Sequence, residues 1–561
     1  MLTLLRSLFV SSFAALALAQ GQSPAPEPFL HEFGAPGERG SFRAQFHPVG
    51  GGMVFLQTMD HFVTLAAARH EAHTPDDYLL LAYNGRDHGL RLVGKPSATK
   101  FPEELYKAVW QVAETPDSVT FTLDSGNGLV LRRTLRHDPK NRGFLIEIAL
   151  RNNNAAAGDQ IEFELVGPAL VVQQGSQLIG QQSVGIVALP DGTSEHVAPK
   201  AGVVQRFELD PRQMVFAGST NRFFGAFLDP RDAGARAALT SIAVDTVPVE
   251  GQQDTEIGQH ANSAVRLRYG MALTVPEQGA ETLATYGLYL GPKSFREFET
   301  LDAPERYLPI LDVDLNPPCC GIDVPGGRFM AKSLIKLLGW FHDLIGNWGL
   351  AIIMLTVLVR GSMSPLNFRM QKSMRAYSAR MAVLKPKMDA LKKQFGDDQK
   401  AYQQAMIAFQ REHKVMPPLG GCLPIFLTMP IYIGLFTALR TAYDVRQQPF
   451  VGWITDLSSP DALFDLPFFP HHFNLLPLLW MACFVFLQTR TPLPTDPQQR
   501  QMQSIMRWMP LMFGFMLYGY ASALMLYMVT SMLWSMVESA IVRKILGPVD
   551  PNVASMTPTV M

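Results

Sequence analysis

The sequence predicts a multi-domain membrane protein in which a large β-rich domain precedes an α-helical region with five membrane spans. The chain has 561 residues, which is enough for several domains, and only 17% of them are charged. Short alternating segments separated by turn residues fill the first half, a pattern typical of a β-sandwich. Apolar runs in the second half approach the roughly 20 residues that cross a bilayer.

The overall charge and the cysteines narrow the function classes. The net charge is -1, which indicates neither a nucleic-acid-binding protein nor one with an acidic tail. The four cysteines contain no Cys-x-x-Cys pair, so a zinc site is not expected. No cofactor is predicted for this chain. The adjacent Cys319 and Cys320 either form a strained vicinal disulfide or remain free thiols in a linker.

The N-terminus carries a targeting segment. Residues 1–19 are mostly apolar, with Arg6 near the start and Ala17-Leu18-Ala19 as a cleavage pattern. They form either a signal peptide or an N-terminal membrane anchor, and both place the following region outside the cytoplasm. Residues 20–28 are a proline-containing linker.

Residues 29–310 are predicted to form the β-sandwich domain. Residues 119–123 alternate, 124–128 contain turn residues, and 129–135 return as a second strand of a hairpin. Sandwiches of this kind often bind sugars, but no carboxylate pair or aromatic platform can be placed in a cleft. We therefore favour a scaffold or contact domain, followed by a Pro/Gly linker at residues 311–328.

An amphipathic helix is predicted at residues 329–342. Its apolar face consists of Met330, Leu334, Leu337, Leu338 and Phe341. Lys332 and Lys336 lie on the other side of the helix, beside a predicted membrane span. This pattern favours an interfacial helix that lies on the membrane over a buried helix of a globular domain.

Residues 343–546 are predicted to form the membrane core. The spans are expected at about residues 344–366, 419–439, 474–488, 507–520 and 524–542. Lysine and arginine are concentrated in residues 367–415 and at Arg543-Lys544, so the positive-inside rule places both, with the tail at residues 547–561, in the cytoplasm.

Residues 367–415 are predicted to form a helical hairpin with a basic surface. Gly396-Asp-Asp398 interrupts the helical pattern, and methionines and leucines at helical spacing predict the seam between the two helices. Candidate contact residues for a ribosome or nascent chain are Lys385, Lys387, Lys392 and Lys393. The alternative is that these charges act only as a topology signal.

Arg360 lies within the first predicted span. If it lies in the hydrocarbon, its charge is costly and indicates a function. If it marks the cytoplasmic end, it is a snorkelling arginine. The span itself does not separate these two interpretations.

The C-terminal region resembles the YidC membrane protein insertases of the Oxa-type superfamily over about residues 329–546. The matching motifs are Gly346-Asn-Trp-Gly349, Val359-Arg-Gly361, Pro365-Leu366, Leu384-Lys-Pro-Lys387, Gly396-Asp-Asp398, Pro418-Leu-Gly-Gly-Cys422, Met429-Pro430, Pro449-Phe450, Asp456-Leu457 and Trp508-Met-Pro510. The resemblance implies a bacterial inner-membrane protein with a periplasmic β-supersandwich followed by a five-span insertase core that carries a cytoplasmic hairpin.

The resemblance also implies a hydrophilic groove that opens to the cytoplasm and to lipid. The residues that match groove positions are Arg360, Thr356, Thr428, Tyr527 and Met528. The chain departs from the family pattern at two of them: Met528 replaces the second residue of an aromatic pair, and Thr428 stands where glutamine is common. The family's retained N-terminal anchor is also replaced by a segment that looks cleavable.

We expect a membrane protein insertase and chaperone rather than an enzyme. The expected partners are nascent membrane proteins, the Sec translocon, the ribosome and the lipid bilayer. A solute transporter would use Arg360 as an anion site, but no repeat between halves is visible. A membrane-anchored enzyme that acts on sugars would require a catalytic motif, and neither GxSxG, HExxH nor a Walker loop occurs.

Overall fold

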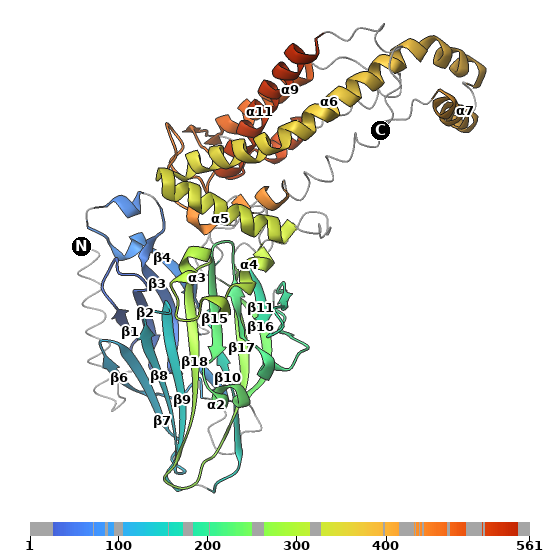
Figure 1. The fold of residues 1–561 in the computed structure, drawn as a ribbon. Coiled ribbons are helices and arrows are strands. Elements are labelled where there is room, and N and C mark those ends of the chain that lie inside the picture. Colours follow the sequence, from blue (N-terminus) through green and yellow to red (C-terminus); the bar gives the residue numbers. More distant parts are fainter. Residues whose placement is uncertain are drawn as a thin grey trace. The chain divides into compact units, whose positions relative to one another are not determined.

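The computed structural model divides the chain into two compact units, Met1–Gln174 with Gln181–Val313 and Gly175–Gly180 with Asp314–Met561 (Figure 1). The residues that it describes are 26–64, 66–70, 72–84, 88–94, 105–154, 156–171, 183–200, 202–248, 263–314, 327–395, 399–413, 431, 433–436, 438–439, 442–467, 472–489, 508 and 511–547. The predicted targeting segment at residues 1–19, Cys319, Cys320 and Thr428 lie outside this set.

The first unit is built on antiparallel strands, as the sequence predicts. The largest sheet has nine strands in the order β12-β11-β14-β15-β18-β9-β8-β7-β6. In chain order their bounds are β6 Gln111–Thr115, β7 Ser118–Asp124, β8 Leu129–Asp138, β9 Gly143–Asn152, β11 Val184–Ala188, β12 Ser194–Val197, β14 Phe216–Thr220, β15 Phe224–Pro230 and β18 Glu281–Pro292. The predicted hairpin is confirmed as β7 and β8.

Two smaller sheets complete the described strands of this unit. The five-stranded sheet contains, in spatial order, β13 Gln205–Arg206, β16 Leu239–Pro248, β17 Ser263–Thr274, β10 Gln160–Val166 and β5 Leu92–Gly94. The four-stranded sheet contains β1 Phe29–Phe33, β2 Phe42–His47, β3 Gly52–Phe62 and β4 Tyr78–Tyr83. Bridges from Leu170 to Ala82 and to Val265 connect the two small sheets.

The large sheet packs face to face against the two smaller sheets. At one end, the rings of Phe33 and Phe144 lie 4.8 Å apart between centroids. At the other end, the hydroxyl of Tyr269 donates a hydrogen bond to the Ala217 carbonyl oxygen across 2.8 Å. Alternate residues of β9 point into this interior, and Phe144 is 2% exposed. The fold of this unit is therefore a large β-sandwich.

Short helices lie between the strands and after the last one. They are η1 Ala67–Arg69, η2 Pro75–Asp77, η4 Pro211–Gln213, α2 Ala233–Ala238, α3 Phe295–Glu299, η5 Pro304–Arg306 and α4 Pro309–Asp314. The segment that follows β18 closes the sandwich, because Tyr307 and Ile310 are buried against Phe216 and Phe227 of the large sheet.

The second unit is mainly helical. Its described elements are α5 Gly327–Ile345, α6 Trp348–Phe395, α7 Gln399–Glu412, η7 Tyr443–Val445, β19 Phe464–Asp465, β20 His472–Phe473, α9 Leu475–Thr489 and α11 Ser522–Leu546. Among the described helices, the segments Trp348–Ser373 and Ser522–Leu546 are long and apolar enough to cross a membrane, and α9 is apolar but shorter.

The predicted spans differ in how far the structure describes them. Most of residues 419–439 lies outside the described set, and residues 507–520 are described only at 508 and 511–520. The five-span arrangement therefore stays a prediction. One difference is clear: α6 continues from the first apolar segment into the predicted hairpin as one helix (Figure 1). Pro365 and Pro386 each remove a backbone donor without ending this helix.

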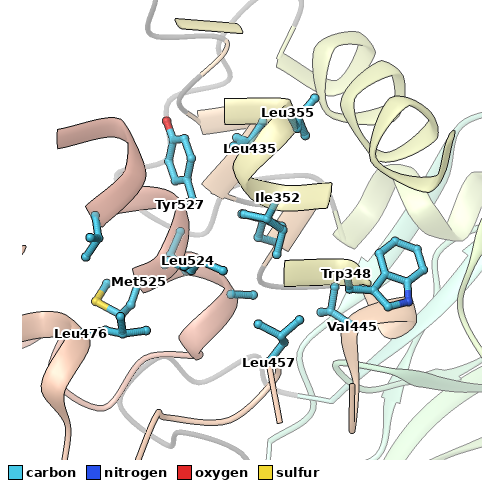
Figure 2. Packing of buried hydrophobic residues seen from close by; sticks show 14 of the residues in the cluster. Trp348, Ile352, Leu355, Leu435, Val445, Leu457, Leu476, Leu524, Met525 and Tyr527 are labelled. Carbon is cyan, nitrogen blue, oxygen red and sulfur yellow. The ribbon is translucent and has the colours of Figure 1, made fainter. Parts of the chain in front are cut away.

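The core of the helical unit gathers apolar residues from several segments. Trp348, Ile352 and Leu355 of α6 lie near Leu524 and Met525 of α11 (Figure 2). The loop before α9 and α9 itself also contribute to this core, through Val445, Leu457 and Leu476.

Helix α5 packs its predicted apolar face into the same core. Leu334, Leu338 and Phe341 are buried there. Phe329 and Trp340 instead remain exposed, by 74% and 59%. The face that the sequence assigns to lipid is thus covered by the protein, whereas two large apolar side chains outside that face are open.

The polar loop before α9 is tied to both neighbouring helices. One carboxylate oxygen of Asp461 accepts hydrogen bonds from the backbone N–H groups of Leu475 and Leu476, at 2.8 and 2.9 Å. It therefore satisfies two of the unpaired donors at the start of α9. The Ser522 and Ala523 N–H groups donate to carbonyl oxygens of the same loop, so the start of α11 is held as well.

Candidate functional site between α6 and α11

Helices α6 and α11 are joined by a ladder of polar contacts. Asn367 donates to Glu538 at 3.5 Å, and the guanidinium of Arg375 donates to the Gly547 carbonyl oxygen at 3.1 Å. Because the partners advance together along both helices, α6 and α11 run parallel. The same face also contains Arg360, which donates to the hydroxyl of Ser531.

The sequence places these groups on facing stripes. Positions 360, 364 and 367 of α6 are separated by four and three residues and therefore share one face of the helix. Positions 531, 534 and 538 of α11 have the corresponding spacing of three and four. The indole N–H of Trp534 donates to the Ser364 hydroxyl at 3.2 Å, which joins the middle of the two stripes.

Arg360 is half-buried and makes the first contact of this ladder along α6. Its charge interacts with the hydroxyl of Tyr527 on one side and with the carboxylate of Glu538 on the other. Ser531 is 3% exposed, and its hydroxyl also hydrogen-bonds Tyr527, so it links two of the predicted groove residues. Burial weakens the hydration of a guanidinium, so polar and acidic neighbours matter here more than at the surface.

Glu538 lies one step further along the ladder. Its Oε2 accepts the hydrogen bond from Asn367, and its charge interacts with Arg360. Its Oε1 is inaccessible to solvent and has no hydrogen-bond partner among the described residues. A buried carboxylate oxygen without a partner is costly, and this marks Glu538 as a functional candidate.

The other predicted groove residues occupy different surroundings. Thr356 is fully buried, and its hydroxyl donates to the Ile352 carbonyl oxygen at 2.6 Å. Tyr527 is buried at the apolar cluster drawn in Figure 2, and Met528 packs partly buried against that cluster. The structure thus brings Arg360 and Tyr527 together, whereas the hydroxyl of Thr356 is turned to its own helix.

All four hairpin candidates belong to α6, and the described side chains of Lys387 and Lys393 lie outside its buried seam with α7. Met388 and Phe409 form the buried seam, with Leu384 and Leu391 packed against it, which confirms the predicted seam for these positions. Lys387 and Lys393 are exposed, and the Nζ atom of Lys387 lies 3.4 Å from Nε2 of His413. The side chains of Lys385 and Lys392, and of Met374 and Met381 in the seam, lie outside what the structure describes.

Sequence reasoning missed Ser531, Glu538 and Asn367. The signal was present, because an acidic residue within the predicted span 524–542 carries the same cost as the arginine within 344–366. The spacing of Tyr527, Ser531 and Glu538 on one helical face would have grouped them. Their pairing with Arg360 required the relative register of the two helices.

Comparisons with known proteins cover this same region. Residues 340–548 match the family described as 60Kd inner membrane protein. The chain is 34% identical over 299 residues to the membrane protein insertase YidC of Actinobacillus pleuropneumoniae, and 33% identical over 332 residues to that of Aliivibrio salmonicida. These alignments cover 53% and 59% of this chain and 49% and 52% of the relatives. The chain spans about half the length of the curated relatives it matches.

A solved structure with the description of an active YidC insertase with its first transmembrane domain resolved also aligns with the chain. The alignment covers 96% of this chain and 99% of the other, at 15% identity and a TM-score of 0.34. The inner-membrane family and the two long apolar helices together indicate a membrane protein.

Proposed function

We propose that this chain, whose C-terminal region belongs with the YidC membrane protein insertases, inserts membrane proteins into the bacterial inner membrane. The match of residues 340–548 carries this proposal. The polar ladder between α6 and α11 supports it, because it holds a cation within the first of two apolar helices. Insertion by such a protein requires no covalent chemistry.

The physical task is to move a polar flank of a nascent helix across a low-dielectric layer. A charge at the centre of a bilayer costs on the order of 3 kcal/mol on translocon scales. A hydrated groove shortens the path that the flank must cross without water, and a fixed cation attracts acidic flanks. The apolar part of the nascent chain then partitions into lipid through its own hydrophobic burial.

In this proposal the groove is lined by Arg360, Tyr527, Met528 and Thr428. Arg360 supplies the charge, Tyr527 and Met528 offer contact surface, and Thr428 adds a polar group from the second span. Thr356 is proposed as the remaining groove residue, and its buried hydroxyl, which donates to the Ile352 carbonyl oxygen, also supports a role in packing the turn before Arg360.

The proposed arrangement has the β-sandwich in the periplasm and the hairpin with the C-terminus in the cytoplasm. Nascent membrane proteins are the substrates, and the lipid bilayer receives them. The Sec translocon and the ribosome are proposed partners, and assistance with folding is a proposed second activity. The basic residues in the second half of α6 and in α7 support the cytoplasmic assignment through the positive-inside rule.

The test uses a panel of single-span substrates that differ only in the number of acidic residues in the translocated flank. Arg360→Ala should lower insertion of the most acidic substrate roughly tenfold, because contacts to charged groups contribute about 1.5–3 kcal/mol. Arg360→Lys should retain most activity if a positive charge is the requirement. Protease protection in cells depleted of the native protein measures insertion.

The exposed Arg369 on the same helix provides the matched control. Arg369→Ala should leave the dependence on flank charge unchanged. Equal insertion by wild type and Arg360→Ala across the whole panel would return Arg360 to the role of a snorkelling residue. Unchanged insertion after depletion of the protein would remove the proposed function itself.

A further inference from the structure

We infer that Glu538 is a specificity-determining residue that competes with acidic substrate flanks for Arg360. The inference rests on the proposed function, because it concerns which substrates the insertase accepts. Glu538 is the internal counter-charge of the groove cation, and an incoming carboxylate must replace its interaction with Arg360. The chain is thereby tuned away from strongly acidic flanks.

The first step is the position of Glu538 along α11. The predicted span ends at about residue 542, four residues after Glu538. At a rise of 1.5 Å per residue this is about 6 Å along the axis, and the Cα–Cβ bond tilts toward the helix N-terminus, away from that end of the span. The hydrogen bond from Asn367 holds the carboxylate between the two helices.

The second step is what stabilises it. Asn367 of α6 donates to Oε2, and the hydroxyl of Ser364 and the charge of Arg360, both on the same helix, also act on the carboxylate. The Oε1 atom is solvent-inaccessible and makes no hydrogen bond of ordinary geometry among the described residues. The acid is thus held chiefly through Oε2 and by the charge of Arg360.

The third step concerns the field that a substrate meets. A cation and a carboxylate in one half-buried network partly cancel each other at a distance, so the network attracts an acidic flank less strongly than Arg360 alone would. Charge complementarity at a binding site mainly determines which partner is preferred, and a like charge beside the site disfavours partners that carry that charge. Glu538 therefore lowers the advantage of acidic flanks over neutral ones.

A purely structural role makes a different prediction. If Glu538 only held α11 to α6, removing its charge would lower the amount of protein or its activity equally for every substrate. The competition predicted here changes the ratio between substrates instead. The quantity to measure is the insertion of an acidic-flank substrate divided by that of a neutral-flank substrate, normalised to the amount of full-length protein in the membrane.

Glu538→Gln keeps the shape and removes the charge. We expect it to raise this ratio roughly three- to tenfold, because a like charge beside the site disfavours an acidic flank. Glu538→Asp should stay near wild type. Asn367→Asp places a second carboxylate in the network and should lower the ratio, so a change of opposite sign tests the idea even if Glu538→Gln accumulates poorly. Glu412→Gln, on α7 outside the predicted spans, is the control for loss of one negative charge.

The double variant Arg360→Ala with Glu538→Gln tests whether Glu538 acts on substrate choice through Arg360. If Glu538 acts through Arg360, the effect of Glu538→Gln on the ratio disappears in the Arg360→Ala background. An active wild type with an unchanged ratio in Glu538→Gln and in Asn367→Asp overturns the inference and leaves the proposed function standing. A wild type that inserts no substrate above the depleted background overturns both.

Discussion

Arg142 is the centre of a buried charge network in the β-sandwich. Its guanidinium contacts Asp60 at 2.5 Å and Glu297 at 3.2 Å, and His61 lies 2.6 Å from the other oxygen of Asp60. Burial alone would raise the pKa of Asp60. The hydrogen bond from His61 and the charges of His61 and Arg142 outweigh that effect and hold the pKa well below its usual value.

This network gives a prediction for stability. Asp60→Asn removes one partner of a buried pair and should lower the free energy of unfolding by about 3 kcal/mol. Urea unfolding of a fragment that covers residues 26–313 measures it. The exposed Asp117 supplies the control, because Asp117→Asn should change stability by less than about 0.5 kcal/mol.

The pH dependence follows from the lowered pKa of Asp60. An acid whose pKa is lower in the folded state stabilises above the unfolded value of about 4, and this contribution is lost as pH falls toward the folded pKa. The difference between wild type and Asp60→Asn should therefore be full at pH 7 and shrink below about pH 4. A difference that stays constant down to pH 3 would mean that the ionised carboxylate is not what stabilises the fold.

Also at the residue scale, the sequence shows which charged residues are unusual, but it does not show which residues they contact in the fold. Arg360 stands out because it interrupts an apolar run. Its contact with Ser531 joins residues 171 positions apart and depends on how two helices align. Neither hydropathy nor helical spacing contains that alignment.

At the scale of elements, the periodicity of the sequence predicted the buried faces of helices and strands better than it predicted where each element begins and ends. The alternation of β7 and β8 and the seam of the hairpin were both readable, because each depends on local spacing. The continuity of α6 was not, since an apolar span and a polar helix look like separate segments although the backbone hydrogen bonds pass from one to the other. Pro365 and Pro386 made a break the natural expectation.

The basic surface of the hairpin carries the prediction at this scale. Reversing Lys385, Lys387, Lys392 and Lys393 to glutamate together should slow insertion several-fold without inverting the protein, because the seam at Met388 and Phe409 is untouched. Pulse-chase protease protection of a substrate measures the rate, and protease mapping of the protein measures its orientation.

Two control variants distinguish a contact surface for substrate insertion from a topology signal. Four arginines at the same positions keep the charge and should keep the rate, whereas four glutamines test loss of charge without reversal. An inverted orientation of the glutamate variant would show that the lysines are a topology signal. A rate equal to wild type in the correct orientation would remove the contact surface from the proposal.

At the scale of the whole molecule, composition predicted the division into a β-rich part and a helical part. Apolar runs and alternating strands differ in period and in charge, so this division is visible without alignment of distant residues. The division into sheets was not visible, because it depends on which strands pair. The nine-stranded sheet joins β9 to β18, which are separated by more than 100 residues.

The last prediction is that the β-sandwich unit is dispensable for insertion. The described residues form two compact units that divide after Val313, and the family match begins only at residue 340. Deleting residues 29–313 should therefore retain roughly half or more of wild-type insertion per molecule, because each unit has its own core.

The position at which the deletion ends affects the expected result. A deletion that stops at residue 308 would leave Ile310 and Leu311 without the aromatic cluster that buries them. That shorter deletion should accumulate less well, since it exposes an apolar segment. Stable accumulation of the longer deletion with complete loss of insertion would make the β-sandwich part of the insertion machinery.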